Sequence, residues 1–286
     1  MQKSNSNINH QKNISSENFP VGSWLLPTAL KLHVINFYNF ARAADNIADS
    51  NVFVMNVKYK KLKQFVEGIK QLNFRGTPPK EVVEMVRTLE ETKVSKQYCL
   101  DLLQAFKQDV SKNRYNDWLE LLNYCKLSAA PVGRYLIDLH GGFKNGDKKY
   151  FKNSDALCNA LQILNHLQDC QEDFLYLNRV YLPLDMLKNY NVPLDHLTAN
   201  KASLELRECL DEILNKVDIL ILESSEFPSK LNSRRLSMES YIIINIAAKL
   251  SKKLRKLDPI AAKIRLSKFT YFQCFVLGIF KAISIC

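Results

Sequence analysis

Two stretches decide the fold of this chain: FYNFARAADNIAD at residues 37–49 and NHLQDCQEDF at residues 165–174. Each holds two aspartates four residues apart, namely Asp45 with Asp49 and Asp169 with Asp173. Because an α-helix repeats every 3.6 residues, this spacing predicts that each pair shares one helix face. Like charges four apart destabilise a helix by roughly 0.2–0.5 kcal/mol. Because this unfavourable arrangement occurs twice within apolar segments, we expect that the two helix faces together bind a cation.

The pattern alone leaves two readings open. A carboxylate pair on a helix is usually a solvated face, Arg42 can be an ordinary partner of Asp45, and Tyr38 can be an amphipathic core residue. Against this, the pair recurs, and Asp45 lies in a run rich in Ala, Ile and aromatic residues. Carboxylates are hard oxygen ligands, which suit Mg²⁺ shared with substrate phosphates. We therefore expect Mg²⁺ and a diphosphate, with Tyr38, Arg42 and Asn165 on the two aspartate faces.

Composition and periodicity predict an all-α protein. The chain has 286 residues, of which 47% are hydrophobic, with only eight Gly and nine Pro. Apolar residues recur at helical spacing, for example at Leu157, Leu161, Leu164 and Leu167. We expect about ten helices around one core, a disordered polar tail at residues 1–16, and a single domain over residues 17–286.

The expected helices follow the apolar pattern and the Gly and Pro breaks. They lie within 51–80 and at about 80–92, 94–112, 115–140, 154–177, 200–225, 233–256 and 258–284. The run SAAPVG at residues 128–133 predicts a kink, which either opens room for a long chain or is a plain packing feature. The apolar end TYFQCFVLGIFKAISIC is short for a membrane span, so it is read as a core helix, with membrane docking as the alternative.

Charge and cysteine usage narrow the function classes. Seven Cys without a CxxC motif are typical of reduced, mostly buried thiols in a cytosolic protein. The five His show no zinc-ligand spacing. A net charge of +11, concentrated at residues 249–268, suits an anionic partner. Without a nucleic-acid motif, we expect a diphosphate and peripheral contact with an anionic membrane on its cytoplasmic face, and no nucleic acid.

Beyond these patterns, the run ENFPVGSWLLPTALKLHVINFYNFARAADNIAD resembles the N-terminal region of the squalene/phytoene synthase family. Three further blocks agree: NYCKLSAAPVGRYLIDLHG, NALQILNHLQDCQEDFLYLNRVYLP and DPIAAKIRLSK. The resemblance covers residues 17–268. It implies a class I isoprenoid synthase bundle with a deep central cavity, a prenyl diphosphate substrate, and two aspartate motifs on facing helices that hold Mg²⁺.

The resemblance also implies roles for individual residues. The metal ligands would be Asp45, Asp49, Asn165, Asp169 and Asp173. The diphosphate contacts would be Arg42, Arg179 and Tyr181, with Tyr38 and, as a weaker match, Tyr241 nearby. Tyr124 would be catalytic together with Asp45 and Asp169. Ring faces attract cations, so Phe19, Phe37, Phe40 and Tyr124 are candidates to face a carbocation. For Phe37 and Phe40, a place in the ordinary core is the favoured interpretation.

Departures from the family pattern bear on the reaction. Asn46 follows Asp45 where a second aspartate is common, Gln168 stands where many members have a basic residue, and Glu17 replaces a Ser-rich opening. Asn46 points about 100° away from Asp45 on a helix, so that change matters little. The changes at Gln168 and Glu17 favour a member that handles one diphosphate. The runs ENFPV, AFKQDVSKNRY and NHLQDCQEDF also resemble the hydroxysqualene-forming members of the family. This resemblance implies a reaction that ionises presqualene diphosphate and captures water to give hydroxysqualene, without a hydride donor.

Two alternatives stay open. The chain could condense two prenyl diphosphates head to head, giving presqualene diphosphate, squalene or phytoene. It could also be a non-catalytic assembly subunit of a membrane complex. Neighbouring enzymes of the same pathway are possible partners in each case.

Overall fold

The computed structural model describes residues 27–71 and 77–284, and over these residues the protein is all-α, as predicted. The helices are α1 (Thr28–Asp49), α2 (Met55–Lys70), α3 (Lys80–Thr92), α4 (Gln97–Asp109), α5 (Trp118–Ser128), α6 (Ala130–Leu139), α7 (Phe151–Gln168), α8 (Cys170–Leu177), α9 (Leu184–Asn189), α10 (Leu204–Glu223), α11 (Arg234–Lys256) and α12 (Lys268–Ser284). Short 3-10 turns lie at Lys144–Gly146, Lys148–Tyr150, Leu194–Thr198 and Phe227–Lys230. The predicted tail at residues 1–16 lies outside the described residues.

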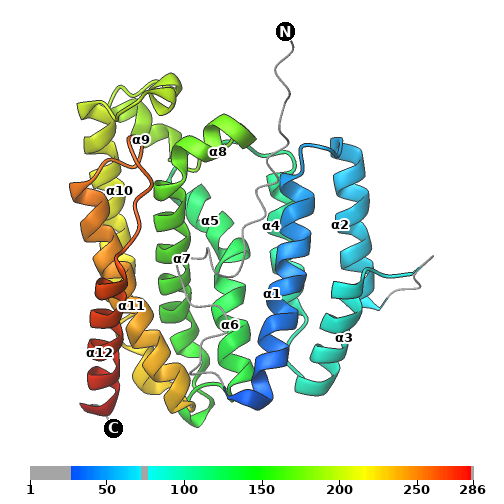
Figure 1. Cartoon of the computed structure of the whole chain (residues 1–286). Coiled ribbons are helices and arrows are strands. Elements are labelled where there is room, and N and C mark those ends of the chain that lie inside the picture. The colour runs from blue at the N-terminus through cyan, green and yellow to red at the C-terminus, as the bar shows by residue number, and fades with distance from the viewer. Residues whose placement is uncertain (1–26, 72–76, 285–286) are drawn as a thin grey trace.

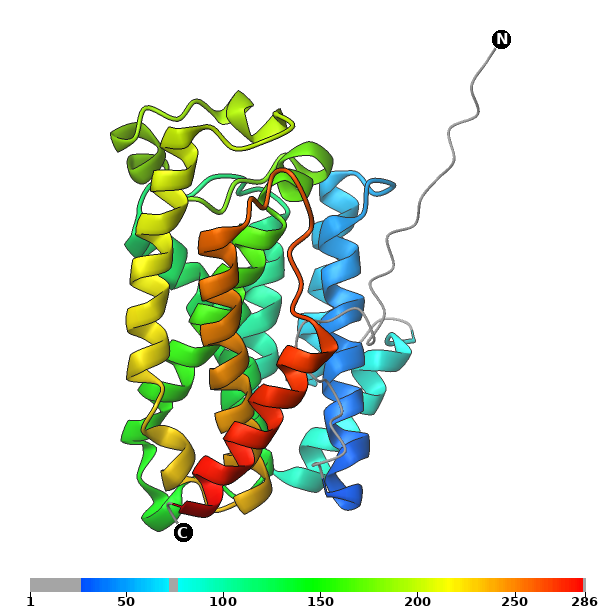
Figure 2. The same ribbon diagram turned by 60° about the vertical axis from the view of Figure 1, so that its left-hand side comes forward.

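Three groups of helices stand side by side along the long axis of the bundle (Figure 1). α1 to α4 form one side, α5 to α7 the middle, and α10 to α12 the other side. The C-terminal end of α1 and the α7–α8 junction lie at the same end of the bundle in both views (Figures 1 and 2). The two aspartate motifs therefore meet at one end, which we call the aspartate end.

Two of the predicted long helices are broken. The helix expected at 115–140 is interrupted at Ala129 (φ −123°, ψ −47°), where the SAAP run had predicted a kink. The helix expected at 154–177 is interrupted at Asp169 (φ −106°, ψ 10°), which caps both α7 and α8. The second motif therefore straddles a joint, whereas the first lies in a continuous helix.

The helix predicted from residue 258 is wrong in its first ten residues. The segment 257–267 is a strap without helical structure, and α12 begins at Lys268. Pro259 has no N–H to donate and disfavours a helical residue before it. In addition, the Asp258 carboxylate accepts hydrogen bonds from the N–H groups of Ile260 (2.8 Å) and Ala202 (2.7 Å), which fixes a turn.

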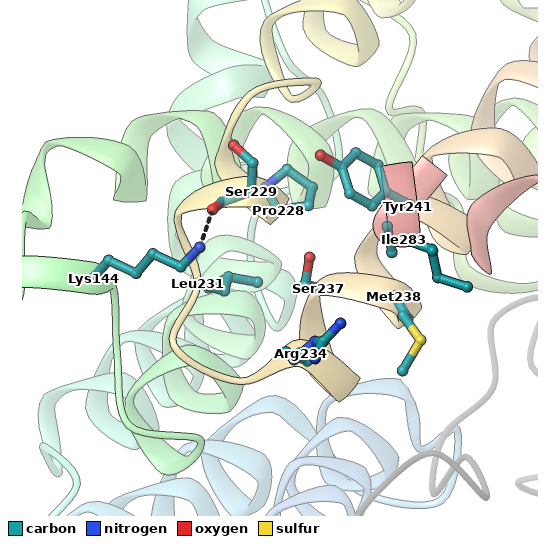
Figure 3. A pocket seen from close by; sticks show the side chains of 10 residues that line it. Lys144, Pro228, Ser229, Leu231, Arg234, Ser237, Met238, Tyr241 and Ile283 are labelled. Atoms are coloured by element: carbon teal, nitrogen blue, oxygen red, sulfur yellow. Dashed lines mark hydrogen bonds between the residues drawn. The ribbon is translucent and has the colours of Figure 1, made fainter. Parts of the chain in front are cut away.

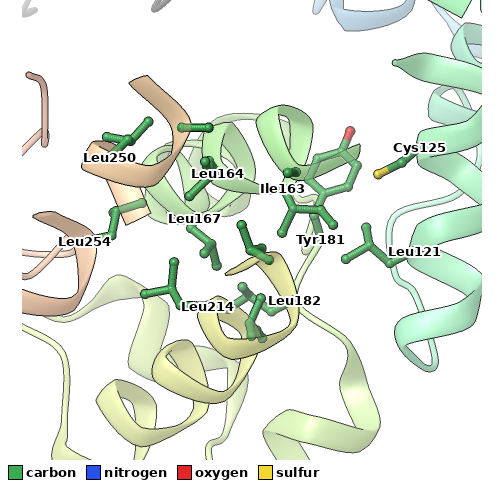
Figure 4. Close-up of a cluster of buried hydrophobic side chains, with 14 of the residues drawn as sticks. Leu121, Cys125, Ile163, Leu164, Leu167, Tyr181, Leu182, Leu214, Leu250 and Leu254 are labelled. Carbon is green, nitrogen blue, oxygen red and sulfur yellow. The ribbon is translucent and has the colours of Figure 1, made fainter. Parts of the chain in front are cut away.

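The protein has two large hydrophobic clusters instead of the single core that we expected. The N-terminal cluster gathers buried residues of α1 to α4 with Tyr135 and Leu139 of α6. The C-terminal cluster gathers α5, α7 and α9 to α11, with the segment after α8 (Figure 4). The boundary between the two clusters runs along α4 and α6, since Ala105 and Ile137 belong to the C-terminal cluster while Phe106 and Tyr135 belong to the N-terminal cluster.

Two glycines allow helices to approach closely. A Cβ at Gly133 would lie 2.6 Å from Cys158 Sγ, and a Cβ at Gly278 would lie 2.7 Å from the backbone N of Ile242. Gly133 thus lets α6 pack on α7, which supports the packing reading of the SAAPVG run. The six described cysteines are free, and five of them are buried, as predicted.

α12 lies on the surface, so its reading as a core helix is wrong. α12 lies against α11 in the ribbon view (Figure 2) and packs on it through Cys274 and Gly278. Its other side exposes large apolar residues. These are Phe269, Phe272, Leu277, Phe280 and Ile283, which we call the α12 outer face. Within the described ranges, no helix is both long and apolar enough to cross a membrane.

Candidate functional site

The first aspartate motif is held by two arginines. Asp45 pairs with Arg42 one turn earlier on α1, with 2.7 Å between Nη1 and Oδ2. Asp49, the last residue of α1, pairs with Arg179 Nη1 at 2.6 Å. Arg179 follows α8 directly, so this ion pair ties the first motif to the segment just after the second.

The second motif is held by a lysine and a histidine. Lys263 Nζ of the strap lies 3.3 Å from Asp169 Oδ1 and 3.0 Å from Glu172 Oε2. Asp173 Oδ2 lies 3.9 Å from the His166 ring, an ion pair only if that histidine is protonated. All four aspartates thus lie close to a cationic or ionisable side chain of the protein.

The chemistry of these donors fits a magnesium ion. The four carboxylates are hard oxygen ligands, and their side chains are 15–37% exposed, so ions and water reach them. Over the part of the chain that the structure describes, no three His, Cys, Asp or Glu side chains form a metal-binding group by themselves. Mg²⁺ commonly uses few protein carboxylates and completes its shell with water and phosphate oxygens.

Behind Asp49 lies a buried polar network centred on Asp109, the last residue of α4. Asp109 is 5% exposed, and its carboxylate accepts hydrogen bonds from the hydroxyls of Tyr124 (2.9 Å) and Tyr181 (3.3 Å). Its backbone carbonyl accepts one from Arg179 Nη2 at 2.9 Å. Arg179 therefore joins Asp49 to this network.

Burial governs the ionisation of the network. Burial raises the pKa of Asp109 to about 7, although the nearby Arg179 charge opposes the shift. Burial, followed by the Asp109 charge, raises the pKa of Tyr124 and of Tyr181 well above the usual tyrosine value, so both hydroxyls keep their protons. Burial alone would lower the pKa of Arg179, but its anionic neighbours outweigh burial and raise that pKa.

An aromatic cluster surrounds the two tyrosines. The His166 ring stacks on Tyr181, with 3.6 Å between centroids and 14° between planes. Tyr115 lies 5.2 Å from Tyr124 and 5.5 Å from Tyr181, centroid to centroid. Tyr181 stands between Ile163 and Cys125 at the edge of the C-terminal cluster, with its hydroxyl directed away from the leucines (Figure 4). Four buried aromatic rings therefore pack together beside the aspartate end.

The sequence reasoning missed Asp109, His166 and Lys263. Asp109 falls on the apolar stripe of α4, three residues after Phe106 and seven after Leu102, and a carboxylate on such a stripe could have indicated a buried site. His166 lies within the quoted second motif. Nothing local marks Lys263, because its role depends on a contact across 94 positions of sequence.

Of the other predicted site residues, some lie on the aspartate faces, some lie in the core, and some lie outside the described residues. Tyr38 and Asn165 lie on the aspartate faces of α1 and α7 and are half-buried. Phe37 stacks on Tyr135 at 3.9 Å and Phe40 is fully buried in the N-terminal cluster, in line with their reading as core residues. Phe19 and Glu17 lie outside the described residues.

Tyr241 is not brought to the aspartate end. It precedes Arg255, near the end of α11, by 14 residues, which is roughly 21 Å of helix. Instead it lines a pocket at the other end, between α11, α12 and the turn at Phe227–Lys230 (Figure 3). Arg234, Ser237 and Lys144 also line that pocket, and Lys144 donates to the Ser229 carbonyl at 3.0 Å.

An all-α bundle with paired aspartates at one end is the arrangement expected of a class I isoprenoid synthase. Residues 13–270 match the family described as squalene/phytoene synthase. The chain belongs to the squalene/phytoene synthase family, as its sequence blocks had indicated.

Individual relatives agree with this assignment. The chain is 36% identical to a hydroxysqualene synthase of Rhodopseudomonas palustris, over 98% of this chain and 92% of that protein. It is 36% identical to a hydroxysqualene synthase of Sinorhizobium fredii, over 88% of this chain and 84% of that protein. A presqualene diphosphate synthase of R. palustris is 27% identical over 64% of each chain.

A solved structure also resembles this fold. The crystal structure of a squalene synthase from Alicyclobacillus acidocaldarius superposes with a TM-score of 0.69 and 26% identity. The match covers 85% of this chain and 90% of that chain.

Proposed function

We propose that this protein converts presqualene diphosphate and water into hydroxysqualene and diphosphate. The observation that carries the proposal is the contrast between two R. palustris relatives, because the hydroxysqualene synthase matches over nearly the whole chain and the presqualene diphosphate synthase over about two thirds.

The first step breaks the carbon–oxygen bond to the diphosphate, and the electron pair leaves with the diphosphate. Asp45, Asp49, Asp169 and Asp173, with Asn165, would hold Mg²⁺, which neutralises charge on the leaving group when bound. Arg42 and Arg179 lie at the same end with planar, permanently charged guanidinium groups that suit phosphate oxygens. Each charge-assisted contact contributes roughly 1.5–3 kcal/mol.

The carbocation then needs electron-rich surfaces that are poor in water. The rings of Tyr124 and Tyr181 lie 5.4 Å apart, and both are buried. Because Asp109 accepts from both hydroxyls, it fixes their hydroxyl protons toward itself and leaves the ring faces oriented. One water then forms the new carbon–oxygen bond, and a proton is released to solvent or to the diphosphate.

The decisive experiment gives purified protein Mg²⁺ and presqualene diphosphate without NADPH. We expect pyrophosphate and hydroxysqualene, with oxygen from ¹⁸O-labelled water in the alcohol, because water is the nucleophile. In a parallel reaction, farnesyl diphosphate alone should be a poor substrate. Efficient consumption of farnesyl diphosphate with accumulation of presqualene diphosphate would overturn the proposal in favour of head-to-head condensation.

We also propose that the protein associates peripherally with anionic bilayers on the cytoplasmic side. The α12 outer face exposes five large apolar side chains, and residues 240–284 contain nine Lys and Arg but one acidic residue, Asp258. Each cation near an anionic surface contributes about 1 kcal/mol. Flotation with phosphatidylglycerol vesicles should exceed flotation with phosphatidylcholine vesicles and should weaken with salt. Equal flotation with both lipids would remove the electrostatic part.

A further inference from the structure

The strap between α11 and α12 crosses the second aspartate motif. It passes beside α8 before it turns down to α12 (Figure 2). Ile260 and Ile264 anchor it, being 5% and 2% exposed, and Lys253 donates to the Arg265 carbonyl. The strap is therefore held to the bundle on both sides of Lys263.

Gln168, on α7, holds the strap in place next to Lys263. The Gln168 side chain is buried, and its Nε2 donates to the Ile264 carbonyl at 2.5 Å. Lys263, the next residue, is 40% exposed at its side chain and reaches Asp169, the residue after Gln168. The buried Gln168 amide thus holds a partly exposed cation next to the second motif.

The contact between Gln168 and the strap determines which part of the chain supplies positive charge to the second motif. In this chain the side chain at 168 is neutral and holds the strap, while the strap supplies a cation from position 263. The positive charge at the second motif therefore comes from the strap and not from α7.

We propose that Lys263 is a diphosphate-binding residue that rests on Asp169 and Glu172 when no diphosphate is present. An ammonium on a flexible stem can exchange a carboxylate partner for a phosphate oxygen with little backbone movement, and lysine binds phosphate as a point charge. While it rests on Asp169, it also opposes a second cation at that carboxylate. The inference rests on the proposed function, because it assumes that this end of the bundle binds a diphosphate.

The test measures two affinities of the full-length protein by calorimetry, one for Mg²⁺ alone and one for inorganic pyrophosphate with saturating Mg²⁺. In Lys263→Gln, Mg²⁺ alone should bind several-fold more tightly, because the competing cation is gone. Pyrophosphate with Mg²⁺ should bind about tenfold or more weakly, because one charge-assisted contact is lost. The opposite signs distinguish partner exchange from a purely structural role.

Lys256→Gln is the matched control, since Lys256 is an exposed lysine in the last turn of α11 and the change in net charge is the same. Thermal unfolding of both variants checks that they are folded. The inference is overturned if both affinities of Lys263→Gln change in the same direction, or if neither differs from the control. Failure to turn over presqualene diphosphate would instead overturn the proposed reaction, while the two binding constants still decide the role of Lys263.

Discussion

The two aspartate motifs have the same spacing but are held in different ways. The first lies in a continuous helix and is paired with arginines, one of them 7% exposed and tied to the buried Asp109 network. The second straddles the joint at Asp169 and is paired with a lysine on a strap and a histidine. The difference indicates that the first motif forms a fixed side of the site and the second motif an adjustable side. Four predictions test it.

The largest expected effect is on turnover. Asp49→Asn and Asp169→Asn each keep shape and remove a charge that a metal ion needs, so each should lower turnover by at least about 100-fold. Asp49→Asn should also lower the thermal stability more than Asp169→Asn does. Asp49→Asn leaves the buried Arg179 without its carboxylate, whereas the partner of Asp169 is a half-exposed lysine. Near-normal turnover by either variant at low Mg²⁺ would remove that residue from the metal site.

Arg179→Met should have the largest effect on stability. It breaks the pair with Asp49 and the bond to the Asp109 carbonyl. Loss of a buried partner costs roughly 3–5 kcal/mol, and we expect about 3 kcal/mol because Asp49 is partly solvated. Urea unfolding of Arg179→Met beside Arg179→Lys measures this. A loss below about 1 kcal/mol would show that the first motif is not the fixed side.

Asp109→Asn should change how stability depends on pH. The folded-state pKa of Asp109, about 7, lies above the ordinary aspartate value of 3.8, so the folded protein binds more protons between these values. Stability from this group is present at low pH and is lost as pH rises toward 7, by at most about 1.4 kcal/mol per pH unit. Arg179, Tyr124 and Tyr181 contact Asp109, and Asp49 lies nearby.

Urea unfolding from pH 5 to 8 should therefore show a smaller loss of stability with pH in Asp109→Asn than in the unsubstituted protein. Identical slopes would mean that Asp109 is ionised throughout. Circular dichroism at each pH supplies the check that both proteins start from the same helical state.

The smallest expected effect is that of Arg42→Met. Arg42 and Asp45 are partly exposed and lie three residues apart on one helix, so their pair contributes only about 0.2–0.5 kcal/mol to folding. Affinity for pyrophosphate should still fall about tenfold, because a phosphate contact is lost. A stability loss as large as that of Arg179→Met would make the two arginines equivalent.

Much of the fold could be predicted from local patterns. Apolar periodicity placed α3 and α11 to within a residue or two, and the SAAP run indicated the break at Ala129. The strap could not be predicted as well, because its apolar residues continue a helical pattern and only Pro259 argues against a helix. The two-cluster interior was missed because periodicity shows which face is buried but not against which helix.

The candidate site could be predicted only in part, because only some of its features are local in the sequence. Spacing pointed to the four aspartates, since a helix face is a local property. The pairing of Asp49 with Arg179 and the meeting of Asp109 with Tyr124 and Tyr181 arise from packing between distant segments. No local pattern contains that information.

The division of the interior into two clusters has a consequence for how the chain is made. All buried residues of the N-terminal cluster except Tyr135 and Leu139 come before residue 107. Domains generally fold in order as they leave the ribosome. The first four helices can therefore collapse on one another early, while α6 closes them later. Asp49 can pair with Arg179 only after the chain up to residue 179 has been synthesised. The proposed metal site, which also needs Asp169 and Asp173, is therefore assembled after the N-terminal cluster.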